Sequence, residues 1–244
     1  MDGASAGGIG EMASGETSWE DAEGQIRPHF LFNALTTIQA YVRERPGLAE
    51  ELIGALARYI QTVLTRRGPV FLAEELALVQ VYLGLERARL GARLRTIFDV
   101  DPMALRLSMP TLLVQPLVEN AVVHAAARRV NGATLRLAVR YRPARDRLVV
   151  MVADDGPGIV RAPAEVETAP QLRESWGGGR VGVRSTRLRL QSAYGRSARL
   201  RLLRRCGGGT IAAFSIPAHA AGSTRPAAGR PRDGTLGAMR WSGR

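Results

Sequence analysis

Apolar residues recur at three- and four-residue spacing along three stretches of the N-terminal part of the chain, which predicts three helices. The first begins near Gln25 and ends at the break Pro46-Gly47, the second covers Leu52 to Val63, and the third runs from Ala73 to Leu90. The first two are joined by so short a turn that they form an antiparallel hairpin. Because this hairpin has apolar surface on more than one side, we expect two copies to form a dimeric four-helix bundle.

The periodicity changes after residue 90, where apolar and polar positions begin to alternate. Strands and helices then follow one another in an order that predicts an α+β domain, with helices on one face of a mixed sheet. The expected strands are 95–100, 134–141, 148–153, 200–204 and 210–216, and the expected helices are 110–127 and 181–194.

These patterns divide the chain into four parts. Residues 1–22 lack any period and are rich in small and acidic residues, so we expect a disordered leader. Residues 23–90 form the helical part and residues 91–218 the α+β domain. Residues 219–244 are rich in Gly, Arg and Pro, which predicts a disordered basic tail.

Composition favours a cytoplasmic protein with a real core. Hydrophobic residues make up 45% of the chain, yet no stretch approaches the roughly 20 apolar residues of a membrane span. No secretory signal pattern is present at the N-terminus. Cys206 is the single cysteine, which excludes an intrachain disulfide and a cysteine-based metal site.

The net charge of +12 comes from arginine alone, because the chain contains no lysine. A coding bias is the simplest cause. Such a charge also attracts nucleic acid, anionic lipid or nucleotide phosphates. The arginines are spread over many segments instead of forming one basic run, which argues against nucleic acid as the main partner.

One of the three histidines, His29, lies at the start of the first predicted helix, directly after Pro28. A proline fits the first helical turn, where its missing N–H costs little. A histidine among large apolar residues is either a phosphoryl acceptor or a core residue. Its own neighbourhood does not decide between the two.

Polar residues interrupt the apolar stretch from Gln115 to His124. Asn120 and His124 are four residues apart and so share a face of a helix. An amide oxygen at Asn120 is a suitable ligand for Mg²⁺, which prefers oxygen. The alternative is a helix end with its polar side in water.

A second polar stretch, Asp154-Asp155-Gly156-Pro157-Gly158, directly follows a predicted strand. A carboxylate at a strand end can accept a hydrogen bond from the amino group of adenine. The glycines allow a sharp turn and a close approach of the backbone to a ligand. The alternative is an ordinary turn at the end of a strand.

Two further stretches are rich in glycine. Residues 176–183 lead into a helix, where free N–H groups and the helix dipole favour a phosphate, although a flexible linker has the same composition. Its spacing matches neither a P-loop nor a dinucleotide fingerprint. Gly208-Gly209-Thr210 is expected to form a hairpin turn.

Together, in order and spacing, these stretches resemble the nucleotide-binding boxes of the GHKL ATPase superfamily. The upstream half is similar to the LytS/YehU-type sensor histidine kinases: residues 28–33 resemble their histidine box, 82–90 their tyrosine-leucine to arginine segment, and 117–121 their N box. The resemblance covers residues 25–217.

The resemblance implies that His29 attacks the γ-phosphate of ATP and that the phosphoryl group then passes to an aspartate of a response regulator. It also implies a homodimer and the cofactors ATP and Mg²⁺. The other implied roles are Asn120 for Mg²⁺, Glu119 as a candidate base, His124 for nucleotide contact, Asp154 with Gly156 and Gly158 for adenine, Gly178 and Gly182 for the lid, and Thr210 for the adenine end.

The chain departs from the family pattern at four positions, namely Val123, Asp155, Arg180 and Ser185. Val123 stands where a phosphate-binding lysine is usual, and Arg187 or a neighbouring arginine is expected to compensate. The alternative is a weakened kinase, or a scaffold that binds nucleotide or the regulator without phosphotransfer. The family's membrane-embedded sensor has no counterpart here, which leaves open a fragment, a soluble kinase, or a kinase served by a separate sensor protein.

Overall fold

The computed structural model describes residues 27–66, 68–126, 131–158 and 179–218, without the side chains of 179–181. The chain separates into two compact units, Met1–Arg66 with Val81–Arg89, and Arg67–Gln80 with Leu90–Arg244. Helix α4 (Leu72–Leu90) therefore contributes its first half to the second unit and most of its second half to the first. The expected leader 1–22 and tail 219–244 lie outside the described residues.

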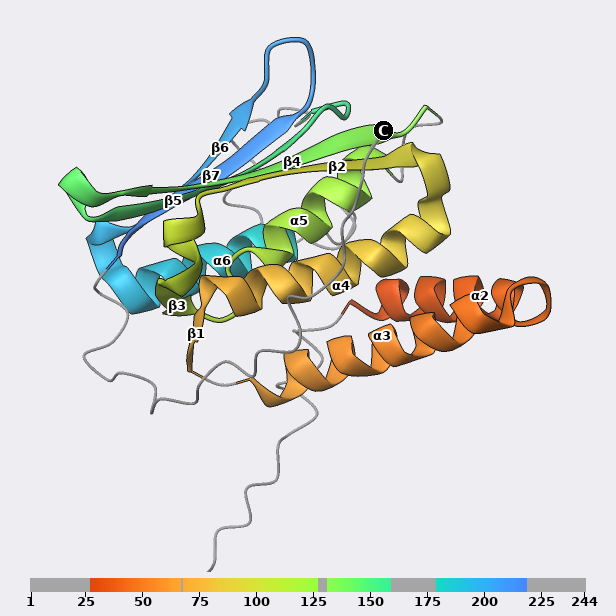
Figure 1. Cartoon of the computed structure of the whole chain (residues 1–244). Coiled ribbons are helices and arrows are strands. Elements are labelled where there is room, and N and C mark those ends of the chain that lie inside the picture. The colour runs from red at the N-terminus through yellow and green to blue at the C-terminus, as the bar shows by residue number, and fades with distance from the viewer. Residues whose placement is uncertain (1–26, 67, 127–130, 159–178, 219–244) are drawn as a thin grey trace, which may run out of the picture. The chain divides into compact units, whose positions relative to one another are not determined.

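The first unit contains the predicted helical hairpin, formed by α2 (Pro28–Glu44) and α3 (Pro46–Thr65) (Figure 1). Each helix begins with a proline, where no N–H is needed for the intrahelical pattern. The connection is shorter than expected, because Pro46 opens α3 and Arg45 alone lies between the helices.

Three aromatic rings form the centre of the first unit. Phe30 lies 5.0 Å from the ring of Tyr59 and 5.0 Å from that of Tyr82, while the two tyrosine rings are 6.2 Å apart. Nearby, the Tyr41 hydroxyl donates to the carbonyl of Ala88 over 3.2 Å. These contacts fasten the second half of α4 to the hairpin.

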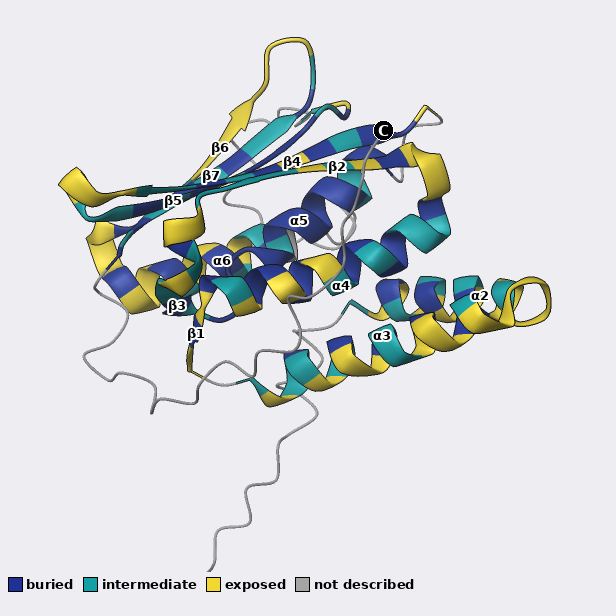
Figure 2. Cartoon of the chain, in the orientation of Figure 1, coloured by how far each residue is buried: buried dark blue, intermediate teal, exposed yellow. Residues whose placement is uncertain are grey.

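Part of the surface of the hairpin is exposed (Figure 2), and it includes large apolar side chains. More than half of the side-chain surface is exposed at Phe32, Leu35, Val42 and Ile53. Large apolar side chains exposed together are typical of an interaction surface. The dimeric bundle predicted from the sequence remains a prediction, and this face is where it would form.

The second unit is built on a five-stranded mixed sheet in the order β2-β4-β5-β7-β6, in which β2 and β4 are parallel and all other pairs antiparallel. Its strands are β2 (Leu94–Val100), β4 (Ala133–Arg142), β5 (Arg147–Asp154), β6 (Arg199–Arg204) and β7 (Thr210–Pro217). Each matches an expected strand within a residue or so. The predicted mixed sheet is confirmed.

Helices α5 (Gln115–Ala121) and α6 (Gly179–Tyr194) lie on one face of this sheet (Figure 1). Alternate residues of β4, such as Leu135, Leu137 and Val139, are buried toward them, whereas Arg136 between them is exposed. The α+β class with helices on one face of a mixed sheet is therefore confirmed. Short 3₁₀ turns connect the elements at Gly91–Arg93, Pro102–Arg106, Pro143–Arg145 and Gly195–Ser197.

The expected helix 110–127 is wrong over its first part. Pro110 ends strand β3 (Ser108–Pro110), which pairs with β1 (Pro69–Phe71), and residues 111–114 are bends. Both strands were missed because three residues are too few to show a period. The helix starts at Gln115 and continues after Ala121 as a π-helical turn, η3 (Val122–Ala126).

Among the described residues, no helix is both long and apolar enough to cross a membrane.

Candidate functional site

His29 is the second residue of α2, and its side chain is exposed while the adjacent Phe30 is buried in the aromatic cluster. The interpretation of His29 as a core residue is therefore wrong for this structure. Its Nδ1 atom lies 3.1 Å from the side-chain nitrogen of Asn33, one helical turn later. This contact orients the imidazole ring through Nδ1 and does not involve Nε2.

Asp154 is the last residue of β5, and its carboxyl group is buried. Its Oδ1 atom accepts hydrogen bonds from the backbone N–H of Gly156 at 2.9 Å and of Thr210 at 3.3 Å. Burial raises the pKa of Asp154 above its usual value, and these two hydrogen bonds partly offset the effect because they stabilise the charged form. A carboxylate held in this way can receive one further donor.

Glycines allow the two turns beside Asp154 to approach each other. A Cβ at Gly209, whose φ is +95°, would lie 2.0 Å from the carbonyl oxygen of Asp154. A Cβ at Gly158, whose φ is +81°, would lie 3.1 Å from the carbonyl oxygen of Gly209. The turn after β5 and the turn before β7 thus meet backbone to backbone. The two predicted stretches, 154–158 and 208–210, therefore form one candidate site.

Helix α5 and the π-helical turn η3 form the second part of this candidate site. A Cβ at Gly156 would lie 2.6 Å from the Cβ of Ala125 in η3, so the π-helical turn rests directly on the Asp154 turn. Asn120 and Glu119 are largely buried in α5, and the Gln115 amide donates to Glu119 Oε1 over 2.8 Å. The helical segment therefore meets the Asp154 turn at Ala125, five residues after Asn120.

His124 is half-buried within η3. Its expected position on the same face as Asn120 assumed α-helical spacing, which ends at Ala121. A π-helical turn bonds residue i to i+5 and is wider, so residues four apart no longer eclipse. π-turns of this kind are frequent at functional sites.

The remaining expected site residues that the structure describes lie on α6. Gly182 is buried in α6, whereas Arg184 and Arg187 are exposed on it. Gly178 and the side chain of Arg180 lie outside the described residues.

Sequence reasoning missed the contact made by Asp155. Its Oδ1 atom accepts from the backbone N–H of Thr134 at 2.7 Å, which ties the turn after β5 to the start of β4. The residue is thus engaged with the backbone of the sheet. No local signal predicts this bond, because its two partners are 21 residues apart.

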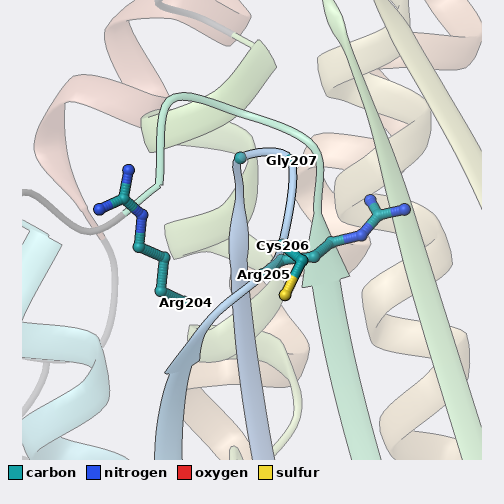
Figure 3. A pocket seen from close by; sticks show the side chains of 5 residues that line it. Arg204, Arg205, Cys206 and Gly207 are labelled. Atoms are coloured by element: carbon teal, nitrogen blue, oxygen red, sulfur yellow. The ribbon is translucent and has the colours of Figure 1, made fainter.

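A hollow at the tip of the β6–β7 hairpin is lined by Arg204–Gly208 (Figure 3). Arg204 and Arg205 point to opposite sides of the turn in Figure 3, with the Cys206 thiol between them. The charge of Arg205 makes a small contribution to lowering the pKa of Asp154. Because five consecutive residues of one turn form this hollow, it encloses no ligand site of its own.

Several known proteins are similar to this chain. The family model described as "Histidine kinase" matches residues 18–94. Sensor histidine kinase YpdA of Escherichia coli (strain K12) is 32% identical over 197 residues, which cover 80% of this chain and 33% of that protein. Sensor histidine kinase/phosphatase LytS of Staphylococcus aureus (strain MRSA252) is 30% identical over 199 residues, covering 79% and 34%. The chain thus spans about a third of the length of the curated relatives it matches.

Two solved structures are also similar. The catalytic domain of histidine kinase ThkA aligns over 63% of this chain and 97% of its own, with 18% identity and a TM-score of 0.48. The histidine kinase domain of the blue-light activated kinase EL346 from Erythrobacter litoralis aligns over 81% and 92%, with 22% identity and a TM-score of 0.44.

Proposed function

Because the chain belongs to the sensor histidine kinases of the LytS type, we propose that it transfers the γ-phosphoryl group of ATP to His29. The phosphoryl group then passes to an aspartate of a response regulator. The observation that carries this proposal is the exposure of His29 beside a buried neighbour at the start of α2. A nucleophile must be reachable by its substrate, and a histidine is largely neutral near pH 7.

The imidazole attacks through Nε2, which must then hold a free electron pair while Nδ1 carries the proton. Asn33 stabilises this tautomer when its amide oxygen accepts from Nδ1–H, which requires only a half-turn of the amide group within the same 3.1 Å contact. The N–P bond forms as the bond between the γ-phosphorus and the bridging oxygen breaks. ADP leaves, and the Nδ1 proton is released to solvent.

The adenine end of the nucleotide fits the surroundings of Asp154. Both backbone hydrogen bonds engage Oδ1, so Oδ2 can accept from the adenine amino group. Gly156 and Gly158 bring the backbone close to the base, and the N–H of Thr210 holds the carboxylate from the other side. This arrangement reads the amino group that distinguishes adenine from guanine.

The phosphate end is assigned to Asn120. Among the described residues, no group of three His, Cys, Asp or Glu side chains could hold a metal by itself. Mg²⁺ is commonly held by one or two protein oxygens together with substrate phosphates, and the Asn120 amide oxygen fits that role. Bound there, Mg²⁺ would neutralise the charge that develops on the phosphate oxygens. His124 and Glu119 remain the candidates for nucleotide contact and for the base. Gly178 and Gly182 are those for the lid, and Arg187 is the candidate for phosphate contact in place of the lysine.

Labelling with γ-³²P-ATP and Mg²⁺ tests this function. We expect an acid-labile, alkali-stable label on the wild type and none on His29→Gln. His219→Gln is the matched control, since it removes another histidine and should keep the label. A His29→Gln protein that still carries alkali-stable label would refute the assignment.

A second candidate is a signalling scaffold that binds nucleotide without transferring it. It is favoured by Val123, which is half-buried in η3 where the family has a phosphate-binding lysine. Calorimetry with Mg-ATP separates the two functions. Nucleotide binding without phosphohistidine, in the presence of candidate response regulators, supports the scaffold, while labelled His29 excludes it.

A further inference from the structure

A buried carboxylate on α4 holds the beginning of α5. Glu75 has no exposed surface, although it lies in the first turn of α4. Its Oε2 atom accepts from the backbone N–H of Leu112 at 2.9 Å. Its Oε1 atom accepts from the N–H of Val114 at 3.0 Å and of Gln115 at 3.3 Å. Both oxygens of one side chain are therefore engaged with one short stretch of backbone.

That stretch is irregular and contains a strained residue. Residues 111–114 form neither helix nor strand, and Leu112 has a φ of +57°, a left-handed conformation that is unfavourable for leucine. The first N–H groups of a helix have no partner within it, and Val114 provides no side-chain cap. Glu75, which lies 37 to 40 residues earlier in the sequence, thus takes the part of a capping residue for α5. Its negative charge suits a helix N-terminus.

The hydrogen bonds of Glu75 are connected, through Gln115 and Glu119, to the neighbourhood of Asn120, the candidate magnesium ligand. Helix α5 has only seven residues, so its direction depends on how its first turn is held. The backbone N–H of Gln115 donates to Glu75, and the Gln115 side chain donates to Glu119, the neighbour of Asn120. A strained backbone conformation persists only where its surroundings determine it strongly, and such places cluster at functional sites.

We propose that Glu75 is a positioning residue of the nucleotide site, which orients the Asn120 amide toward Mg²⁺ by fixing the entry into α5. This role rests on the proposed function, in which Asn120 binds Mg²⁺. In this role Glu75 acts through the backbone N–H groups of Leu112, Val114 and Gln115. Its loss should therefore weaken the contribution of Mg²⁺ to binding and spare the adenine end at Asp154.

The test is the affinity for ADP measured by calorimetry, with Mg²⁺ and with EDTA, on the wild type and on Glu75→Gln. Glutamine has the same size but a single acceptor oxygen, so it cannot serve all three N–H groups. We expect the gain in affinity from Mg²⁺ to fall about tenfold, as is usual when a residue that orients a metal ligand is lost. The affinity in EDTA should stay within about twofold of the wild type.

Leu148→Ala is the matched control for a general loss of stability. Leu148 is fully buried in β5, at the opposite end of that strand from Asp154. This variant should melt earlier and yet keep the full gain from Mg²⁺. If Glu75→Gln does not fold, Glu75→Asp keeps the charge with a shorter reach, and we expect it to show a smaller loss of the same kind.

An unchanged gain from Mg²⁺ in Glu75→Gln, or equal weakening with Mg²⁺ and with EDTA, would overturn the proposal. A wild type that gains nothing from Mg²⁺ would instead refute the proposed function. In that case, amide hydrogen exchange of the nucleotide-free wild type still tests whether Glu75 holds the N–H groups before α5. Slow exchange at Leu112 and Val114 supports the role of Glu75, since these amides lie outside helix and strand, and fast exchange contradicts it.

Discussion

Asp154, the proposed adenine-binding residue, is buried at a cost to the stability of the fold. Burial raises the pKa of Asp154, so the folded protein keeps the carboxyl proton to a higher pH than the unfolded chain does. In an unfolded chain, aspartate has a pKa of about 3.9. Between the two pKa values the folded state carries the extra proton, and the free energy of unfolding falls as pH rises. Above the folded pKa the whole penalty is present. In the proposed function, the carboxylate that accepts from adenine is thus charged at a cost to stability.

The first prediction concerns Asp154→Asn. The amide oxygen can still accept from Gly156 and Thr210, while the buried charge disappears. We expect the free energy of unfolding at pH 7.5 to be equal to or higher than in the wild type. ADP affinity should fall by about tenfold or more, since a hydrogen bond to a charged group contributes about 1.5–3 kcal/mol. Urea unfolding and calorimetry measure both, and a strong loss of stability at pH 7.5 would contradict the reasoning.

Gly156 is expected to tolerate no side chain. In Gly156→Ala the new Cβ would lie 2.6 Å from the Cβ of Ala125, so the Asp154 turn and η3 must move apart. Overpacking of this kind costs about 1–3 kcal/mol, and nucleotide affinity should fall with it. Gly47→Ala is the control, because its Cβ meets nothing within 4 Å. Equal melting temperatures and ADP affinities for Gly156→Ala and the wild type would show that the turns do not depend on this contact.

At the level of elements, periodicity predicted what is long and regular. Helices α2, α3, α4 and α6 and all five strands of the large sheet were predicted, because their apolar faces repeat over several turns or residues. The start of α5 was not, since it is set by hydrogen bonds to Glu75, far away in the sequence. The bond between Asp155 and Thr134 was hidden for the same reason. The sequence motifs indicated the residues of the candidate site. The contacts that hold these residues join segments far apart in the sequence, so the motifs could not reveal them.

Helix α4 offers a prediction of its own, because it carries Glu75 in one unit and Tyr82 in the other. Gly84 lies in its interior, and a Cβ there would meet nothing within 4 Å. Since glycine costs about 1 kcal/mol relative to alanine inside a helix, Gly84→Ala should stabilise α4. We expect a melting temperature about 2–4 °C higher. A lower melting temperature, measured by circular dichroism, would mean that this glycine has a further role.

On the scale of the whole molecule, the proposed phosphoryl acceptor and the proposed nucleotide site belong to different compact units. His29 lies in the unit of the helical hairpin, while Asp154 and Asn120 lie in the unit of the mixed sheet. The order of the motifs along the sequence predicted a helical acceptor part followed by a nucleotide-binding domain, and these two roles remain predictions. It could not predict that α4 is divided between the units, because a continuous helix has a single pattern along its whole length.

The exposed face of the hairpin leads to the last prediction, which concerns self-association. Phe32, Leu35 and Val42 follow one another at three- and seven-residue spacing on α2, so they form a single stripe, and Ile53 is exposed on α3. Water would contact this apolar surface in a monomer, whereas a second hairpin would bury it in a four-helix bundle.

We expect a dimer in sedimentation equilibrium at micromolar concentration. Leu35→Glu should shift it to monomer, because it introduces a charge that the bundle would have to bury. Leu188→Glu, at an equally exposed leucine on α6, should leave the dimer intact. A wild type that sediments as a monomer, or a Leu35→Glu variant that still forms the dimer, would mean that the stripe serves a different partner.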